Sequence, residues 1–153
     1  ALIVALLDFV PRLLISCGPE AREVESAHTL CDLFGPRVQT TAGTANWTQL
    51  AWLLHRAAFF VGVDTAAMHL AAACQCPTAA LFGPSPVFEY HPWGVRHWMI
   101  RPQDWLGEAV AKAMPRDALM REIPLERVLA ACSEAWKYGT RTSMESSAES
   151  GPA

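Results

Sequence analysis

Short apolar runs alternate with amphipathic stretches along this chain of 153 residues. Runs of strand length fall at residues 12–17, 37–41, 59–63 and 78–82. Between the first two runs, apolar side chains recur every three or four residues, which is the helical period; they are Val24, Ala27, Leu30, Cys31 and Phe34. Strands that alternate with helices over short connections predict an α/β fold, with a parallel sheet and helices on both of its faces.

Glycine, proline and capping residues mark the element boundaries. A helical stripe over residues 1–9 ends before Pro11, and Gly-Pro pairs follow the first strand and the helix after it. Asn46, with Gln49 three residues later, predicts the start of another helix through a variant capping box. Pro124 suits the first position of a later helix. We therefore expect one domain over residues 1–138, truncated at its N-terminus, and a disordered tail over residues 139–153, where Met144 is the only apolar residue of note.

The stretch from residue 59 to residue 94 carries the chemistry. A strand ends at Asp64-Thr65, a helix of small residues follows over 66–74, and a second strand runs over 78–82. This order predicts a right-handed βαβ unit of parallel strands. Ligands of such sheets lie beyond the carboxyl ends of the strands, where free N–H groups and the helix dipole favour an anion.

The residue types at that position fit a phosphorylated sugar. Ala66 and Ala67 are small enough to let a phosphate approach the backbone of residues 65–67, and His69 lies one turn further into the helix. Asp64 would accept hydrogen bonds from sugar hydroxyls. An ordinary alternative stays open for both side chains: Asp64 as a simple N-cap, and His69 as a core or surface residue without a ligand.

Composition excludes several other classes of function. The net charge of −3 offers no general attraction for nucleic acid or membranes, and no apolar run has membrane-spanning length. The apolar first ten residues lack the basic region and cleavage site of a signal peptide. Five cysteines, an odd number in apolar surroundings, indicate reduced thiols in a cytoplasmic protein. Their spacing does not fit a zinc site.

The run from Val63 to Ala73, then Pro77, then Leu81-Phe82-Gly83-Pro84, resembles the signature of the ADP-heptose:lipopolysaccharide heptosyltransferases, which form glycosyltransferase family 9. The resemblance implies an inverting glycosyltransferase of the GT-B architecture, in which two Rossmann-like halves face each other. It identifies this chain with the C-terminal, donor-binding half. It also implies a last strand near residues 97–100 and a final helix that packs on the domain.

The resemblance assigns roles to particular positions. It implies that Asp64, Thr65, Ala66, Ala67 and His69 contact the sugar diphosphate. It places an acidic residue of the turn after the first strand on the ribose, either Glu20 or, as a fallback, Glu23; each could instead only complement a helix dipole. Thr44, in the turn after the second strand, would lie near the base. Aromatic residues of the loop after Gly83 would either close over the donor or simply pack on the sheet; they are Phe88, Tyr90, His91, Trp93 and Trp98.

The expected reaction is transfer of heptose from ADP-heptose to the inner core of lipopolysaccharide, with no metal. The resemblance implies that the acceptor site and the general base belong to the other half of the enzyme, so the catalytic residues are unknown, and that the first strand of the donor domain also lies upstream of Ala1. We expect a monomer that is cytoplasmic, either free or peripheral to the inner membrane when intact. Two alternatives remain: a non-catalytic α/β module that lacks the acceptor half, and a GT-B transferase or epimerase that uses another nucleotide sugar.

Overall fold

The structure, a computed structural model, describes residues 1–149, with side chains for residues 1–142. The chain divides into two compact units, residues 1–53 and residues 54–153, and the division falls within helix α3 (Trp47–Arg56). We call them the N-terminal unit and the C-terminal unit and describe each by itself. The predicted domain over residues 1–138 stays a prediction.

The N-terminal unit is built on two parallel strands. Strand β1 (Leu13–Ile15) pairs with β2 (Val38–Thr40) in register from Leu13 opposite Val38. Helix α2 (Ala21–Phe34) connects them and packs on β2, with Ala27 buried in its inner face. A 3₁₀ turn, η1 (Gly35–Arg37), ends this connection. These elements agree with the predicted ones to within two residues.

Polar contacts fix the ends of two helices near these strands. Arg37 donates hydrogen bonds to the carbonyl oxygens of Leu7, Val10 and Pro11. Leu7 is the last residue of helix α1 (Leu2–Leu7), and the other two follow it. A cation at that place suits the negative end of a helix. At the start of α3, the side chains of Asn46 and Gln49 each accept the other's backbone N–H at 2.9 Å. The predicted capping box is confirmed.

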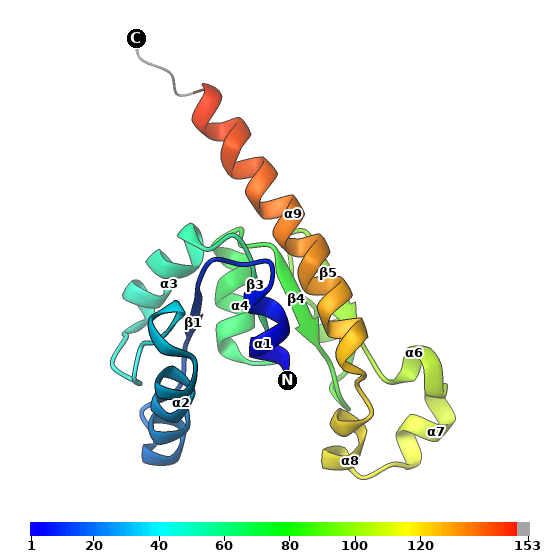
Figure 1. The fold of residues 1–153 in the computed structure, drawn as a ribbon. Helices are drawn as coiled ribbons and strands as arrows, with labels where there is room; N and C mark the ends of the chain where they lie inside the picture. The colour runs from blue at the N-terminus through cyan, green and yellow to red at the C-terminus, as the bar shows by residue number, and fades with distance from the viewer. Residues whose placement is uncertain (150–153) are drawn as a thin grey trace. The chain divides into compact units, whose positions relative to one another are not determined.

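The C-terminal unit contains a sheet of three parallel strands in the order β3-β4-β5 (Figure 1). Val63, Leu81 and Ile100 occupy equivalent positions near the carboxyl ends of the three strands. The strands and helices of this unit are β3 (Phe60–Val63), α4 (Ala66–Ala73), β4 (Thr78–Leu81), α5 (Val87–Tyr90), β5 (His97–Ile100), α6 (Gln103–Leu106), α7 (Glu108–Ala113), α8 (Arg116–Arg121) and α9 (Leu125–Glu149).

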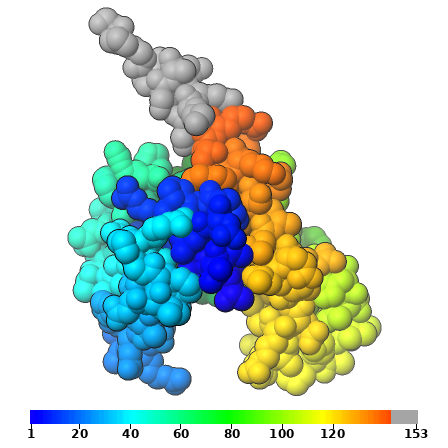
Figure 2. Space-filling model, viewed as in Figure 1, coloured from blue at the N-terminus to red at the C-terminus, as the bar shows by residue number. Residues whose placement is uncertain are grey.

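Helices cover both faces of this sheet. On one face, Met68 of α4 packs with Ala80 and Phe82 in a buried cluster. On the other face lies α9, which contacts β4 and β5 and meets the Trp98 ring through Tyr138. Neighbouring strand residues point to opposite faces, and Ala79 and Ala80 are accordingly both fully buried. The outward face of α9, coloured orange, forms part of the molecular surface (Figure 2).

A glycine permits the close approach of α9 to the chain that enters the sheet. A Cβ atom on Gly139 would lie 1.8 Å from the carbonyl oxygen of Ala58, so no larger residue fits there. The prediction had taken Gly139 as the first residue of an irregular tail. Instead α9 continues to Glu149. Once a helix is established, each residue added to its end gains one hydrogen bond for the backbone angles that it fixes. Residues 150–153 of the predicted tail lie outside the described residues.

Short helices fill the segments around β5 and before α9. Gly107 adopts a φ of 83° between α6 and α7 and so separates two helices. Helices α5 and α8 are also short, with four and six residues. Among the described residues, no helix has the length and apolar character needed to cross a membrane.

Candidate functional site

The carboxyl edge of β3 leads directly into the uncapped start of α4. Thr65 is the N-cap residue, and no side chain hydrogen-bonds to the helix start. The first helical hydrogen bonds run from the amides of Met68 and His69 to the Thr65 carbonyl. Among the described residues, the amides of Ala66 and Ala67 have no acceptor, and the first turn contains no acidic residue. Such a helix start favours an anion.

Asp64 and His69 meet beside this helix start. The Nε2 atom of His69 lies 3.4 Å from Oδ1 of Asp64, an ion-pair distance when the imidazole is protonated. The side chains are 44% and 18% exposed for His69 and Asp64, so both face an accessible surface rather than a closed core. The N-cap alternative for Asp64 is wrong, because Thr65 holds that position. A carboxylate and an imidazole therefore stand next to free amides at one sheet edge.

The N-terminal unit has a second strand end with a different charge. An open groove of about 720 Å³ lies where β1 leads into α2, and both Glu20 and Glu23 line it. Glu20 is the N-cap residue of α2, and its carboxylate makes no capping hydrogen bond. Glu23 accepts a hydrogen bond from the Gly18 amide at 2.7 Å. Glu23 thus holds the turn, and Glu20 is the carboxylate left available.

The turn that contains Thr44 touches the turn before Glu20. Gly43 has a φ of 67°, and a Cβ atom on it would lie 2.5 Å from the Gly18 carbonyl oxygen. The turns after β1 and β2 therefore pack backbone to backbone, which brings two of the predicted site positions into one region of the N-terminal unit. The exposed Thr44 side chain donates its hydroxyl to the Thr41 carbonyl at 2.8 Å.

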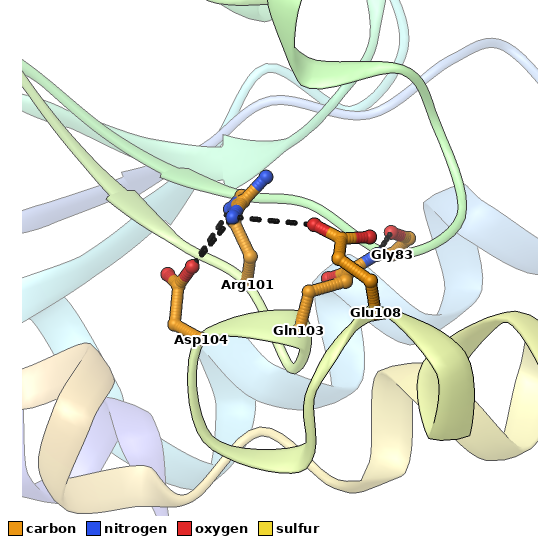
Figure 3. A network of polar contacts seen from close by, with 5 residues as sticks. All are labelled: Gly83, Arg101, Gln103, Asp104 and Glu108. Atoms are coloured by element: carbon orange, nitrogen blue, oxygen red, sulfur yellow. Dashed lines mark hydrogen bonds and ion pairs between the residues drawn. The ribbon is translucent and has the colours of Figure 1, made fainter.

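Sequence reasoning missed a polar network at the end of β5 (Figure 3). Arg101 follows this strand, and its guanidinium lies 2.6 Å from Asp104 and 3.7 Å from Glu108. The hydrogen bond to Asp104 raises the pKa of Arg101 above its usual value. Gln103 donates from Nε2 to the Gly83 carbonyl at 2.9 Å. The position of Arg101 directly after the last strand was the available signal.

The aromatic residues after Gly83 do not gather over the strand carboxyl ends. His91 stacks on Trp93 at 5.1 Å and approaches His97, the first residue of β5, at 5.7 Å. These rings therefore lie toward the amino end of β5. Trp98 packs against Tyr138 of α9, and Phe88 is 88% exposed on α5. For His91, Trp93 and Trp98, the packing interpretation replaces closure over a donor.

The two buried cysteines, Cys76 and Cys132, are poor nucleophiles. All five are free thiols, and burial raises the pKa of both Cys76 and Cys132 to about 12. A thiol with such a pKa stays protonated at neutral pH. Within the described part of the chain, no group of three or more His, Cys, Asp or Glu residues could hold a metal ion.

Comparison with known proteins adds an independent line of evidence. The family model described as glycosyltransferase family 9 (heptosyltransferase) matches residues 1–116. One relative, lipopolysaccharide heptosyltransferase 3 of Escherichia coli strain K12, is 29% identical over 85 residues, which are 54% of this chain and 24% of the relative. Another protein of that name from Escherichia coli is 38% identical over 58 residues, or 38% of this chain and 17% of the relative. The chain thus spans about a quarter or less of their length.

Two solved structures share the fold. A glycosyl transferase family 9 protein from Veillonella parvula DSM 2008 superimposes with a TM-score of 0.70 at 18% identity, over 89% of this chain and 39% of that one. The E. coli ADP-heptose LPS heptosyltransferase II superimposes with a TM-score of 0.56 at 21% identity, over 84% and 39%. The Rossmann-like α/β class predicted from the sequence, as found in GT-B glycosyltransferases, is confirmed. With most of its length matched by the family model, this chain belongs to glycosyltransferase family 9, the heptosyltransferases.

Proposed function

We propose that this chain binds the nucleotide-sugar donor of an inverting heptosyltransferase that transfers heptose from ADP-heptose to the inner core of lipopolysaccharide. The observation that carries the proposal is the start of α4. Two amides without acceptors and a first turn without acids lie beside the Asp64–His69 pair. Family membership gives this helix start its expected ligand, a sugar diphosphate.

Each residue has a chemical role in the proposal. The amides of Thr65, Ala66 and Ala67 stabilise the charge that develops on the departing diphosphate, as preorganised N–H donors do. Asp64 accepts hydrogen bonds from sugar hydroxyls, and His69, held by Asp64, donates to a phosphate or sugar oxygen. In the N-terminal unit, Glu20 accepts from the ribose, and Thr44 lies toward the base. The general base that activates the acceptor is assigned to the other half of the enzyme, and no metal takes part.

The partners follow from the same reaction. The donor is a nucleotide sugar, and the acceptor is the lipopolysaccharide core at the inner membrane, reached through the acceptor half of the enzyme. We place the intact enzyme in the cytoplasm, either free or peripheral to that membrane, and as a monomer. Neither nucleic acid nor a cofactor is part of the proposal.

Thermal melting with and without nucleotide tests the proposal. ADP and ADP-heptose should raise the melting temperature in a concentration-dependent way, because a ligand that binds only the folded state stabilises it. Asp64→Ala should reduce the shift with ADP-heptose more than the shift with ADP. Asp32→Ala, at an exposed position on α2, is the matched control and should keep both shifts.

The outcomes separate the alternatives. No shift with ADP, UDP or their sugars would leave only a non-catalytic module. A larger shift with UDP than with ADP would assign the chain to a transferase or epimerase that uses another nucleotide.

A further inference from the structure

The loop that follows the central strand β4 is held from two sides. Gln103, at the start of α6, donates from Nε2 to the carbonyl oxygen of Gly83 at 2.9 Å, across 20 residues of sequence (Figure 3). On another side, a Cβ atom on Gly83 would lie 2.6 Å from Sδ of Met120 in α8. Gly83 is buried between these contacts, and the loop continues through Pro84, Ser85 and Pro86.

This loop lies next to the start of α4 at the same sheet edge. Val63 of β3 and Leu81 of β4 are register partners, so the chains that leave these strands start one strand spacing apart, about 4.8 Å. One chain continues into Asp64 and Thr65, and the other into Phe82 and Gly83. The 83–86 loop therefore begins close to the strand end that leads to the amides of Ala66 and Ala67.

The Gln103 side-chain amide donates one hydrogen bond but leaves its own oxygen unpaired. Its Oε1 atom is buried and, among the described residues, has no hydrogen-bond partner. An unpaired buried acceptor is unfavourable, and an apolar side chain of the same length would avoid that loss. The presence of an amide here points to a requirement for its N–H donor. The salt bridges from Arg101 to Asp104 and Glu108 hold the flanking segment of α6 and α7 against the end of β5.

We propose that Gln103 is a positioning residue for the donor: it fixes the 83–86 loop through the Gly83 carbonyl and so sets the width of the site at the start of α4. Gln103 acts through the loop and does not touch the ligand. The inference rests on the proposed function for the ligand itself, and on the observed hydrogen bond for the effect on the loop.

Two substitutions at this position test the proposal. Gln103→Met keeps the length and removes the donor, and Gln103→Glu places a carboxylate against the Gly83 carbonyl at neutral pH. Titration calorimetry with ADP should give a dissociation constant about fivefold higher for the Met variant and more than tenfold higher for the Glu variant. The affinity for adenosine, which lacks the diphosphate, should stay within about twofold of the wild-type value.

Hydrogen exchange supplies a readout that does not depend on nucleotide. Exchange over residues 83–90 should accelerate in both variants, while exchange over residues 78–81 stays unchanged. Gln75→Met is the matched control, because the Gln75 amide makes only a long hydrogen bond, at 3.4 Å, to Ala72 of α4, the helix that Gln75 follows. It should alter neither the loop exchange nor the ADP affinity.

The results separate failure of this inference from failure of the proposed function. If wild-type protein binds ADP and both Gln103 variants bind it equally well, Gln103 does not position the loop for the ligand. Equal losses for ADP and adenosine would indicate a general structural role and would also overturn the inference. If wild-type protein does not bind ADP, the proposed function fails, and this inference falls with it as a statement about the donor.

Discussion

Helices α2 and α4 both follow the carboxyl end of a parallel strand, yet their first turns differ in charge. The turn into α2 presents Glu20 and Glu23, and Glu23 already binds the Gly18 amide. The first turn of α4 has no acidic residue, no side-chain cap and two amides without acceptors. Both helices follow a parallel strand, α2 after five intervening residues and α4 after two, and their first turns differ in the side chains that they present.

Under the proposed function, this difference assigns hydroxyl groups to the start of α2 and an anion to the start of α4. Negative side chains in the turn into α2 would repel a diphosphate but accept hydrogen bonds from ribose. The first turn of α4 has no acidic side chain, so its amides and the helix dipole can interact with a phosphate. Asp64, beside this turn, would accept hydrogen bonds from sugar hydroxyls. A nucleotide sugar carries both kinds of group, hydroxyls and a diphosphate, and the proposed function assigns one kind to each unit.

Making the start of α4 resemble that of α2 should have the largest effect. In Thr65→Asp, the new carboxylate lies at the N-cap, whose backbone is extended with φ −149° and ψ 168°. There it can accept hydrogen bonds from the free amides of the first turn. We expect the free energy of unfolding to rise by about 0.5–1 kcal/mol, because an N-cap is gained. The ADP affinity should fall on the order of 100-fold, because the carboxylate takes the anion's place. Chemical denaturation and calorimetry measure the two effects.

The opposite signs make this test specific. Thr65→Asn, which also caps a helix but carries no charge, is the matched control and should lose less affinity than Thr65→Asp. A Thr65→Asp protein that is more stable and still binds ADP normally would show that the anion does not bind at this helix.

The second test concerns how the hydroxyl-binding side is built. Gly43→Ala forces a Cβ atom against the Gly18 carbonyl in a left-handed backbone, and we expect a loss of about 3 kcal/mol in unfolding free energy. Gly35→Ala tests strain without a contact, since Gly35 has a φ of 67° and a ψ of −158° but nothing within 4 Å of the added atom. That variant should lose less, about 1–2 kcal/mol, from its backbone conformation alone. Equal losses, measured by urea denaturation, would mean that the contact between the two turns does not hold the N-terminal unit together.

These tests also show where sequence reasoning succeeded and where it stopped. The strands were found within two residues because buried parallel strands read as apolar runs, and the Asn46–Gln49 cap was found because its two residues lie next to each other in sequence. Asp64, Thr65 and His69 were found together because a strand end and the following helix are local. The positions that the family implies for the donor stay predictions until a ligand is bound.

The contacts that were missed join residues far apart in sequence. The hydrogen bond from Gln103 to Gly83 spans 20 residues, and the approach of Gly139 to Ala58 spans the whole C-terminal unit. The spacing of apolar residues along the sequence predicts neither of these contacts. The choice between the two alternatives for the loop aromatics could not be made from sequence for the same reason, since their partners, His97 and Tyr138, lie elsewhere in the chain.

The smallest expected effects distinguish the two glutamates at α2. Glu23→Ala removes the acceptor of the Gly18 amide and should cost about 1 kcal/mol of unfolding free energy. Glu20→Ala should leave stability unchanged, because its carboxylate makes no hydrogen bond to the helix, but should weaken ADP binding about three- to tenfold and reduce the preference for ADP over 2′-deoxy-ADP. Glu25→Ala, exposed on the same helix, should change neither quantity. If Glu23→Ala lost the ribose preference and Glu20→Ala kept it, the roles would be reversed: the carboxylate that holds the turn would also be the one that reads the sugar, and ribose binding would compete with the Gly18 amide for the same side chain.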